Sequence, residues 1–512
     1  MHYTLQPLPA LALDRGAPLL SLYCNSGSPE DIELQNLIFH DALNAYLATS
    51  NSLFFVSTKS AQDSRLDQLC EHVVQTRFRN IPKDVIEQSK KMFLDTLGAI
   101  VRASSKRYQA GNILAQFAKE QGGKPLASVI HRGFKTNLVN AALVNGTFGY
   151  YCDVESHHVE AVAHVAAVIT PTSLALSEAY LLTGKDLLAA LVVGYDVETR
   201  VSNALDPTQL YKRGFHPSCV AGAFGAAAAA GSLLKLDREE QKRAFGLAGC
   251  QASGLLAWAT DQTENSRPFQ MGLAARNGIT AALLAKEGFG APLSIFEGKN
   301  GLFNAFSDRP KPERLVEDLS KRFTIMEAAF KLYSCCAFLH PGADALLSII
   351  QQNDLDHKQI AEITLRFPAP GASIIDNNEL KSHNAQYILP ILAVFGEVNI
   401  EDILFERRTD PEVNRLSKNT HLIYDEELGP VFPEKYTSVV IVKTKDGKSF
   451  EERVEYAKGT PQNPVALGEI EDKFRKLTAR ELTEARIERC ITTVKGLDKL
   501  QTMTPLINLV KN

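Results

Sequence analysis

The feature that most constrains this fold is an uncharged stretch, rich in alanine and glycine, that runs from Gly214 to Leu234. It is long enough to cross a lipid bilayer. It contains few Leu, Ile or Phe residues, however, and His216 and Pro217 stand near its start, so insertion into lipid would gain little free energy. Small side chains instead let helix backbones approach one another closely. We therefore expect a tightly packed buried helix and no membrane partner.

Helical patterns continue on both sides of this stretch, from about residue 61 onward. Leu66, Leu69 and Val73 follow the spacing of one helix face, and Pro82 stands where a second helix would begin. Further helices are expected over residues 142–149, 171–182, 185–195, 221–234, 238–259 and 272–287. Because Ala and Gly crowd these faces, the pattern favours a close-packed helical bundle over an α/β sheet.

The sequence pattern changes near Met326, where strand-like runs join the helical ones. Strand-like runs are expected over residues 360–367, 437–443 and 449–455, with a hairpin turn at residues 445–448 and helices over residues 342–351 and 385–395. Helical patterns return over residues 465–477 and 483–495. The sequence thus predicts a mainly α fold, in which a large all-α helical bundle (residues 61–326 and 461–512) carries a smaller α+β lid domain (residues 327–460). Residues 1–60 are expected to be an N-terminal extension of unknown order.

Composition excludes several classes of function. The 512 residues carry 55 Lys and Arg against 59 Asp and Glu, a net charge of −4 with no long basic run, so we expect no nucleic-acid partner. The eight cysteines show no CxxC spacing, which is typical of reduced thiols and gives no support for an iron–sulfur cluster. Acidic residues among the first sixty argue against a transit peptide. We expect a cytoplasmic protein, with a mitochondrial location left open.

The first candidate site is a histidine-rich loop. His157, His158 and His164 follow Asp153 and Glu155 in a segment without a clean apolar period, which indicates a loop or a broken helix. Such a loop can present a base together with an orienting carboxylate. Two alternatives stay open at this point. One is a metal site, although the spacing matches no HExxH-type signature, and the other is a solvated polar loop.

Three further positions carry candidate chemistry. His216 stands just before the Ala/Gly-rich helix, where it can act as a base or a hydrogen-bond donor, or only cap the helix. Arg267 also precedes a helix and can bind a carboxylate with two hydrogen bonds, or form a structural ion pair. The segment from Lys331 to His340 joins a cation, the vicinal thiols Cys335 and Cys336, and an imidazole; buried structural thiols are the commoner use of such cysteines.

These motifs, in this order, resemble one family. Asp153…His164, then Gly214-Phe-His-Pro, then Gly272-Leu-Ala-Ala-Arg-Asn-Gly278, then Lys331-Leu-Tyr-Ser-Cys-Cys…His340 are similar to the MmgE/PrpD family of 2-methylcitrate dehydratases and cis-aconitate decarboxylases. The Lys-Leu-Tyr-x-Cys-Cys string resembles the fungal decarboxylases. The similarity covers about residues 61–512.

The resemblance implies a homodimeric lyase without cofactor or metal, whose active site lies in the cleft between a helical domain and a lid. It implies a substrate of the citrate or aconitate type. It also implies catalytic roles for five residues, namely Asp153, His164, His216, His340 and Tyr387. The residues expected to bind substrate are Arg267, Lys331, His157, Gln270 and Cys336.

Two departures from the family pattern bear on the reaction. The consecutive acids usual after the first Asp are Glu155-Ser156 here, and Arg267 stands where the decarboxylases carry Lys. Arg cannot deliver a proton at neutral pH, but it suits a permanently anchored carboxylate. We therefore expect dehydration of 2-methylcitrate or a longer 2-alkylcitrate, with His164 or His216 as general base or acid. A cis-aconitate decarboxylase-like reaction and an inactive member acting as a binding protein are the alternatives.

Overall fold

The helical patterns of the first half of the chain fold into helices that pack on one another. The computed structural model describes residues 64–405 and 410–512, so the predicted extension over residues 1–60 lies outside the described residues. The helices are α2 (Arg65–Gln75), α3 (Lys83–Ala103), α4 (Gln109–Gln121), α5 (Leu138–Tyr151), α6 (Val165–Ala179), α7 (Gly184–Leu205), α8 (Pro207–Lys212), α9 (Pro217–Leu234), α10 (Arg238–Gly249), α11 (Ser266–Lys286) and α12 (Leu302–Phe306). Capping boxes at Thr183 and Asp237 start α7 and α10.

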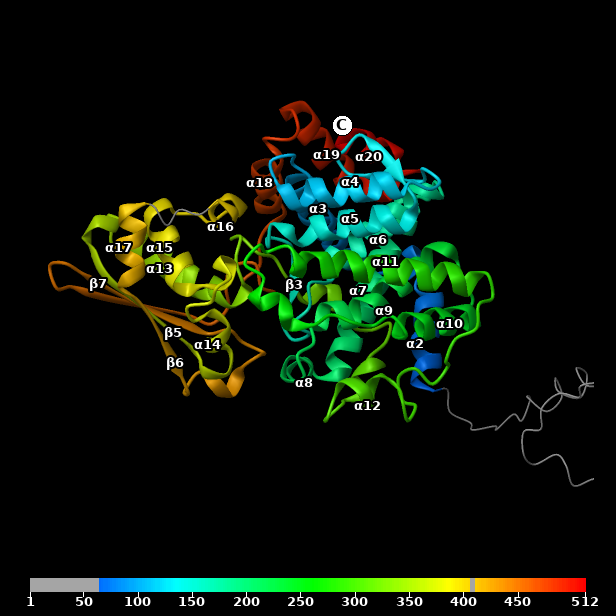
Figure 1. Ribbon diagram of the computed structural model, residues 1–512, viewed down its shortest axis with the longest axis horizontal. Coiled ribbons are helices and arrows are strands. Elements are labelled where there is room, and N and C mark those ends of the chain that lie inside the picture. The colour runs from blue at the N-terminus through cyan, green and yellow to red at the C-terminus, as the bar shows by residue number, and fades with distance from the viewer. Residues whose placement is uncertain (1–63, 406–409) are drawn as a thin grey trace, which may run out of the picture. The chain divides into compact units, whose positions relative to one another are not determined.

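Helix α9, the Ala/Gly-rich stretch, lies at the centre of this bundle and packs against α6, α7 and α11 (Figure 1). All of its residues are buried. Glycines make the close packing possible, since a Cβ at Gly278 of α11 would lie 2.3 Å from the Cβ of Ala226. Within the described part of the chain, α9 is the one helix long and apolar enough to span a membrane, and the protein itself covers it completely.

The α+β part contains a four-stranded sheet with the order β6-β5-β7-β8. Strand β5 (Ile360–Pro368) pairs in parallel with β6 (Thr420–Asp425) and antiparallel with β7 (Ser438–Thr444), which pairs with β8 (Ser449–Val454). The predicted hairpin turn joins β7 to β8, and Gly447 adopts the positive φ of 87° that this turn needs. The helices of this part are α13 (His340–Gln352), α14 (Ala369–Ile375), α15 (Ala385–Phe395), α16 (Ile400–Leu404) and α17 (Pro411–Lys418).

The last helices return to the bundle, as Figure 1 shows for α18, α19 and α20. They span Leu467–Thr478, Glu484–Lys495 and Thr504–Val510. Lys473 of α18 forms an ion pair with Asp95 of α3, and Phe474 packs against Gly98 of the same helix. The predicted mainly α fold with a smaller α+β part is confirmed. The boundaries at residues 326/327 and 460/461 stay a prediction, because residues 63–512 form a single unit.

One local prediction needs correction, and some elements were not predicted. The helix expected over residues 238–259 ends at Gly249, and a short 3-10 helix follows at Leu256–Thr260. Gly254 interrupts the path with a φ of 121°, which turns the chain so that Trp258 is buried. Strand β6 and helix α17 were not predicted, because β6 exposes much of its length and so lacks a clean alternation of apolar residues.

Candidate active site

A cavity of about 260 Å³ lies between the helical bundle and the α+β part. Cationic, imidazole and apolar side chains from both parts of the chain line it together. The side chains that line it are Tyr150, Asp153, His157, Val162, His164, Tyr211, His216, Leu256, Trp258, Ala259, Arg267, Lys331, Cys336, Ala337, Phe338, Ser373, Ile374, Asn378, His383 and Tyr436.

The predicted histidine-rich loop packs against the segment that immediately precedes Lys331. Asp153 adopts a positive φ of 52°, a conformation that Asp tolerates better than most residues, and it turns the chain out of α5. Strand β3 (His157–His158) then pairs antiparallel with β4 (Ala328–Ala329), with His157 opposite Ala329. This pairing brings Lys331 against Asp153 although 178 positions separate them.

Three of the polar side chains lie at the N-terminal ends of helices. His164 and His216 are the N-caps of α6 and α9, and Arg267 lies in the first turn of α11. The hydroxyl of Ser218, also in the first turn of α9, accepts a hydrogen bond from the backbone N–H of His164 at 3.0 Å. The two imidazole rings are consequently close, with 6.3 Å between their centroids.

Six side chains form a closed hydrogen-bonded ring, which we call the proton ring: Arg267, Tyr150, His164, Glu155, Lys331 and Asp153. Arg267 Nη1 donates to the Tyr150 hydroxyl at 2.7 Å and to Asp153 Oδ2 at 3.2 Å. The Tyr150 hydroxyl lies 3.0 Å from His164 Nε2. Glu155 Oε1 lies 2.7 Å from His164 Nδ1 and accepts from Lys331 Nζ at 3.3 Å. Lys331 also donates to Asp153 Oδ1, which closes the ring.

Burial and charge set opposite protonation states for the two carboxylates of the proton ring. Burial would raise the pKa of Asp153, but Arg267 and Lys331 outweigh it and hold that pKa well below its usual range. Burial raises the pKa of Glu155 to about 8, and the negative charge of Asp153 adds to this effect while Lys331 opposes it. Below that pH the ring therefore holds two cations against one carboxylate, an excess of one positive charge.

The imidazoles of the cavity are neutral at physiological pH. Burial lowers the pKa of His164 well below its ordinary value, and the charge of Lys331 lowers it further. Burial likewise lowers the pKa of His216 to about 4 and that of His383 to about 3. His216 Nδ1 lies 2.9 Å from Gln270 Oε1, whose amide nitrogen donates to the carbonyl of Leu255. The amide orientation places the proton on His216 Nδ1 and leaves Nε2 as an acceptor.

Seven of the ten residues expected at the site line this cavity. They are Asp153, His157, His164, His216, Arg267, Lys331 and Cys336. Gln270 does not line it but orients His216. His340 lines a neighbouring cavity of about 290 Å³, which shares His157, Ala337 and Tyr436 with the first. Tyr387 is buried in α15 and donates its hydroxyl hydrogen to the carbonyl of Asp402 at 2.5 Å, so the structure places it outside the cavity.

Sequence reasoning missed Tyr150 and His383, which line the cavity. It named Glu155 as a carboxylate of the histidine-rich loop without giving it a role, and the structure places it behind His164. The signals were present, since Tyr150 precedes the acidic loop and His383 opens the segment that ends at Tyr387. Glu264 and Ser382 extend the network on the far side of Arg267, where Ser382 Oγ donates to Glu264 Oε1 at 2.9 Å.

The carboxylates of the site are engaged with cations. No group of three or more His, Cys, Asp or Glu side chains is arranged to hold a metal ion within residues 64–405 and 410–512. The side chains that line the cavity are suited to anion binding and proton transfer. Arg267 and Lys331 attract carboxylates, and neutral imidazoles and a phenol lie beside them.

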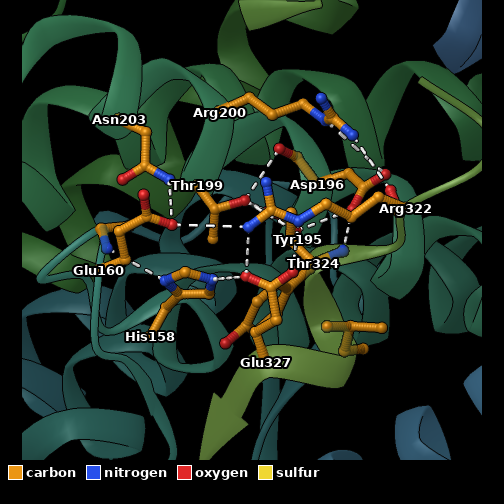
Figure 2. Close-up of polar contacts among 12 residues, drawn as sticks. His158, Glu160, Tyr195, Asp196, Thr199, Arg200, Asn203, Arg322, Thr324 and Glu327 are labelled. Carbon is orange, nitrogen blue, oxygen red and sulfur yellow. Dashed lines mark hydrogen bonds and ion pairs between the residues drawn. The ribbon is translucent and has the colours of Figure 1, made fainter. Parts of the chain in front are cut away.

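A second polar network lies on the other side of the same loop, and Figure 2 shows it. His158 Nε2 lies 3.2 Å from Glu327 Oε2, and its Nδ1 accepts from the backbone N–H of Ala161. Arg322 donates two hydrogen bonds to Glu327, at 2.6 and 2.7 Å. Deeper in, Asp196 accepts from Thr324 and contacts His72. We call this set the structural network.

Comparisons with known proteins find family models and relatives that match most of this chain. The family model of the MmgE/PrpD N-terminal domain matches residues 67–315, and that of the C-terminal domain matches residues 333–499. The chain is 27% identical to a cis-aconitate decarboxylase-like protein, oryM, of Aspergillus oryzae, over 86% of this chain and 96% of that protein. It is 28% identical to the cis-aconitate decarboxylase of Homo sapiens, over 83% and 90%. It is 21% identical to the mitochondrial 2-methylcitrate dehydratase of Yarrowia lipolytica, over 79% and 82%.

Proposed function

Because the chain belongs to the MmgE/PrpD family, we propose that it is a lyase that removes CO₂ from a tricarboxylic acid of the cis-aconitate type. The relatives favour this reaction over the dehydration expected from the sequence. The decarboxylases are 27–28% identical over 83–88% of this chain, whereas the dehydratase is 21% identical over 79%.

The observation that carries the proposal is the mixed lining of the cavity. Arg267 and Lys331 supply positive charge, and Val162, Leu256, Phe338 and Ile374 supply apolar surface. A tricarboxylate anchored through the cations would hold a further carboxylate against apolar side chains. A carboxylate that is poorly solvated loses CO₂ more readily, because its charge is dispersed in the transition state.

The residues take complementary parts in this reaction. Arg267 and Lys331 bind the carboxylates that are retained, and the excess positive charge of the proton ring stabilises the carbanion left by CO₂. Asp153 holds both cations in place through its two oxygens. A proton must then reach the carbanion, and His164 and His216 are imidazoles of the cavity that can handle it.

Dehydration of 2-methylcitrate or a longer 2-alkylcitrate is the second candidate. The acceptor Nε2 of His216 can take a proton from carbon, and the permanently charged Arg267 suits an anchored carboxylate. The likeness to a 2-methylcitrate dehydratase supports it. An inactive binding protein is the third candidate, and the intact proton ring argues against it.

One incubation series tests the proposal. Purified protein is mixed separately with cis-aconitate, 2-methylcitrate and a longer 2-alkylcitrate, and CO₂ release and water loss are followed together. We expect CO₂ from the aconitate-type acid. Water loss from a citrate without CO₂ release would show that the protein is a dehydratase. No turnover of any of these acids would favour the inactive binding protein.

We also propose that the protein is a homodimer. A groove of about 500 Å³ beside α4 and α11 is flanked by Ile113, Phe117 and Phe269, whose side chains are 62%, 46% and 37% exposed. An exposed apolar surface of this kind is typical of an interface. Light scattering after size-exclusion chromatography should give twice the chain mass, and Ile113→Glu should shift the protein toward the monomer. A monomer at every concentration would contradict this proposal.

A further inference from the structure

Tyr150 is the member of the proton ring that joins the cavity to buried proton carriers. Its side chain lines the cavity, and its oxygen contacts two ring partners. Arg267 Nη1 donates to that oxygen at 2.7 Å, and His164 Nε2 lies 3.0 Å from it. The Arg267 guanidinium also lies 4.6 Å from the centroid of the phenol ring. Burial raises the pKa of the Tyr150 phenol well above its ordinary value, and direct contact with the permanent charge of Arg267 opposes that rise.

Glu155 stands at the other end of the same chain of contacts. It is fully buried and does not line the cavity, so no substrate can touch it. Its Oε1 is 2.7 Å from His164 Nδ1, and its Oε2 has no hydrogen-bond partner among the described residues. Glu155, His164 and Tyr150 therefore form a continuous path from an enclosed carboxyl group to the cavity.

This path supports two arrangements of its protons. With Glu155 protonated, the carboxyl donates to His164 Nδ1, His164 Nε2–H donates to the Tyr150 oxygen, and the Tyr150 O–H is free to point into the cavity. With Glu155 ionised, His164 Nδ1–H donates to the carboxylate and the Tyr150 O–H donates to Nε2. The first arrangement holds one proton more than the second, and the difference appears at the cavity end.

Resting on the proposed function, we propose that Tyr150 is the catalytic acid of this site and that Glu155, acting through His164, is the positioning residue that stores its proton. The C–C bond to the leaving carboxylate breaks, CO₂ departs, and the electron pair stays on carbon. That carbon takes the proton of Tyr150. The Tyr150 oxygen takes the proton of His164 Nε2, and His164 Nδ1 takes the proton of Glu155. Decarboxylation consumes one proton from solvent, which returns to Glu155 through Tyr150 and His164 after product release.

Three other proton carriers of the cavity are less suited to this task. Arg267 cannot release a proton at neutral pH. Burial would lower the pKa of Lys331, but Asp153 and Glu155 outweigh it and keep the ammonium group charged, and His216 directs its Nδ1–H to Gln270. The proton source that a lysine would offer at position 267 is absent here, and the path through Tyr150 replaces it.

The charged groups that face Glu155 tune its readiness to hold the proton. Lys331 favours the ionised form, and burial together with Asp153 favours the protonated form, so the pKa of Glu155 lies at about 8. Arg267 acts more weakly from the far side of the ring. The fraction of enzyme with a loaded path therefore falls as pH rises through about 8.

Kinetics of matched tyrosine variants test the proposal. Tyr150→Phe should lower kcat by about 10²–10⁴-fold, the range of a lost general acid, while KM changes only a few-fold. Tyr151→Phe is the control, since its hydroxyl contacts Asn265 at 3.4 Å and does not line the cavity. Circular dichroism of both variants shows whether the fold is kept. Equal kcat values for the two variants would overturn the proposal.

The pH profile of Glu155 variants tests the proton reserve. Wild-type kcat should fall above about pH 8, Glu155→Gln should be slow by 10²-fold or more with no such alkaline limb, and Glu155→Asp should recover part of the rate and the limb. An unchanged limb in Glu155→Gln would overturn the role of Glu155. Failure of the proposed function is a separate outcome, because the wild-type protein would then release no CO₂ from an aconitate-type acid.

Discussion

Glu155 and Glu327 each contact a histidine of the segment between α5 and α6, but their pKa values are shifted in opposite directions. Glu155 meets His164 in the proton ring, where burial raises its pKa to about 8. Glu327 meets His158 in the structural network. There, hydrogen bonds from His158 and Arg322 outweigh burial and lower its pKa to about 2.

The difference comes from exposure and from the number of fixed donors. The side chain of Glu327 is 31% exposed and both its oxygens receive hydrogen bonds from Arg322. Glu155 is wholly enclosed and shares Lys331 with Asp153. A carboxylate saturated by a guanidinium is a permanent structural charge, whereas an under-satisfied buried one can take and release a proton.

The largest expected effect separates two histidines of the loop. His164→Ala should lower kcat by about 10²–10⁴-fold, because it cuts the path from Glu155 to Tyr150. His158→Ala should leave kcat within tenfold, since His158 contacts Glu327 and not the cavity. Steady-state kinetics on the two variants measure this. Similar losses in both would show that the two networks do not differ in function.

A substitution within the structural network should act on stability instead. Asp196→Ala removes the acceptor for Thr324 and the partner of His72, and leaves buried donors unpaired. We expect the free energy of unfolding to fall by about 3 kcal/mol, as for other broken buried networks. Denaturant unfolding measures that loss, and kcat of the folded variant should match the wild type. Undiminished stability would contradict a structural role for this network.

The neutral histidines of the site should make the protein sensitive to acid. The pKa values of His157, His164, His216, His340 and His383 are all lowered in the folded state, to about 4 for His216 and about 3 for His340 and His383. Between those values and about 6.5 the unfolded chain binds more protons, so stability is lost as pH falls through this window.

Each such histidine should contribute about 1.4 kcal/mol per pH unit within that window. Denaturant unfolding at a series of pH values gives the slope. His216→Gln removes one titrating imidazole and should reduce the slope by about 1.4 kcal/mol per pH unit. Glu155 contributes a slope of the opposite sign, because burial raises its pKa to about 8, so the difference between wild type and variant is the test. An unchanged slope in His216→Gln would show that this imidazole titrates normally in the folded protein.

The smallest expected effect concerns the ligand contact of His157. Neither of its ring nitrogens has a hydrogen-bond partner among the described residues, although the ring lines the cavity. An unpartnered buried imidazole is suited to donate to a bound carboxylate. His157→Ala should therefore raise KM about tenfold, the loss of one hydrogen bond to a charged group, with little change in kcat. An unchanged KM would remove His157 from the binding site.

The linear pattern predicted much of the fold and seven of the residues that line the cavity. Helix faces rich in Ala and Gly predicted the bundle, and β-branched runs with a Lys-Asp-Gly-Lys turn predicted three of the four strands in the main sheet. His164, His216, Arg267 and Lys331 were expected at the site because charged and imidazole groups in ordered motifs indicate acid chemistry. Residues 1–60 and the cytoplasmic location remain predictions.

The sequence by itself determined which residue types were available: a close-packed helical body, and imidazoles, cations and carboxylates suited to a polycarboxylic acid. Tertiary structure alone decided which of them meet. The pairing of β3 with β4 brings Lys331 to Asp153, encloses Glu155 and sends His157 and His158 to different networks. The physical reason is that a protonation state depends on burial and on neighbours far away in the chain, and no local pattern of residues specifies either.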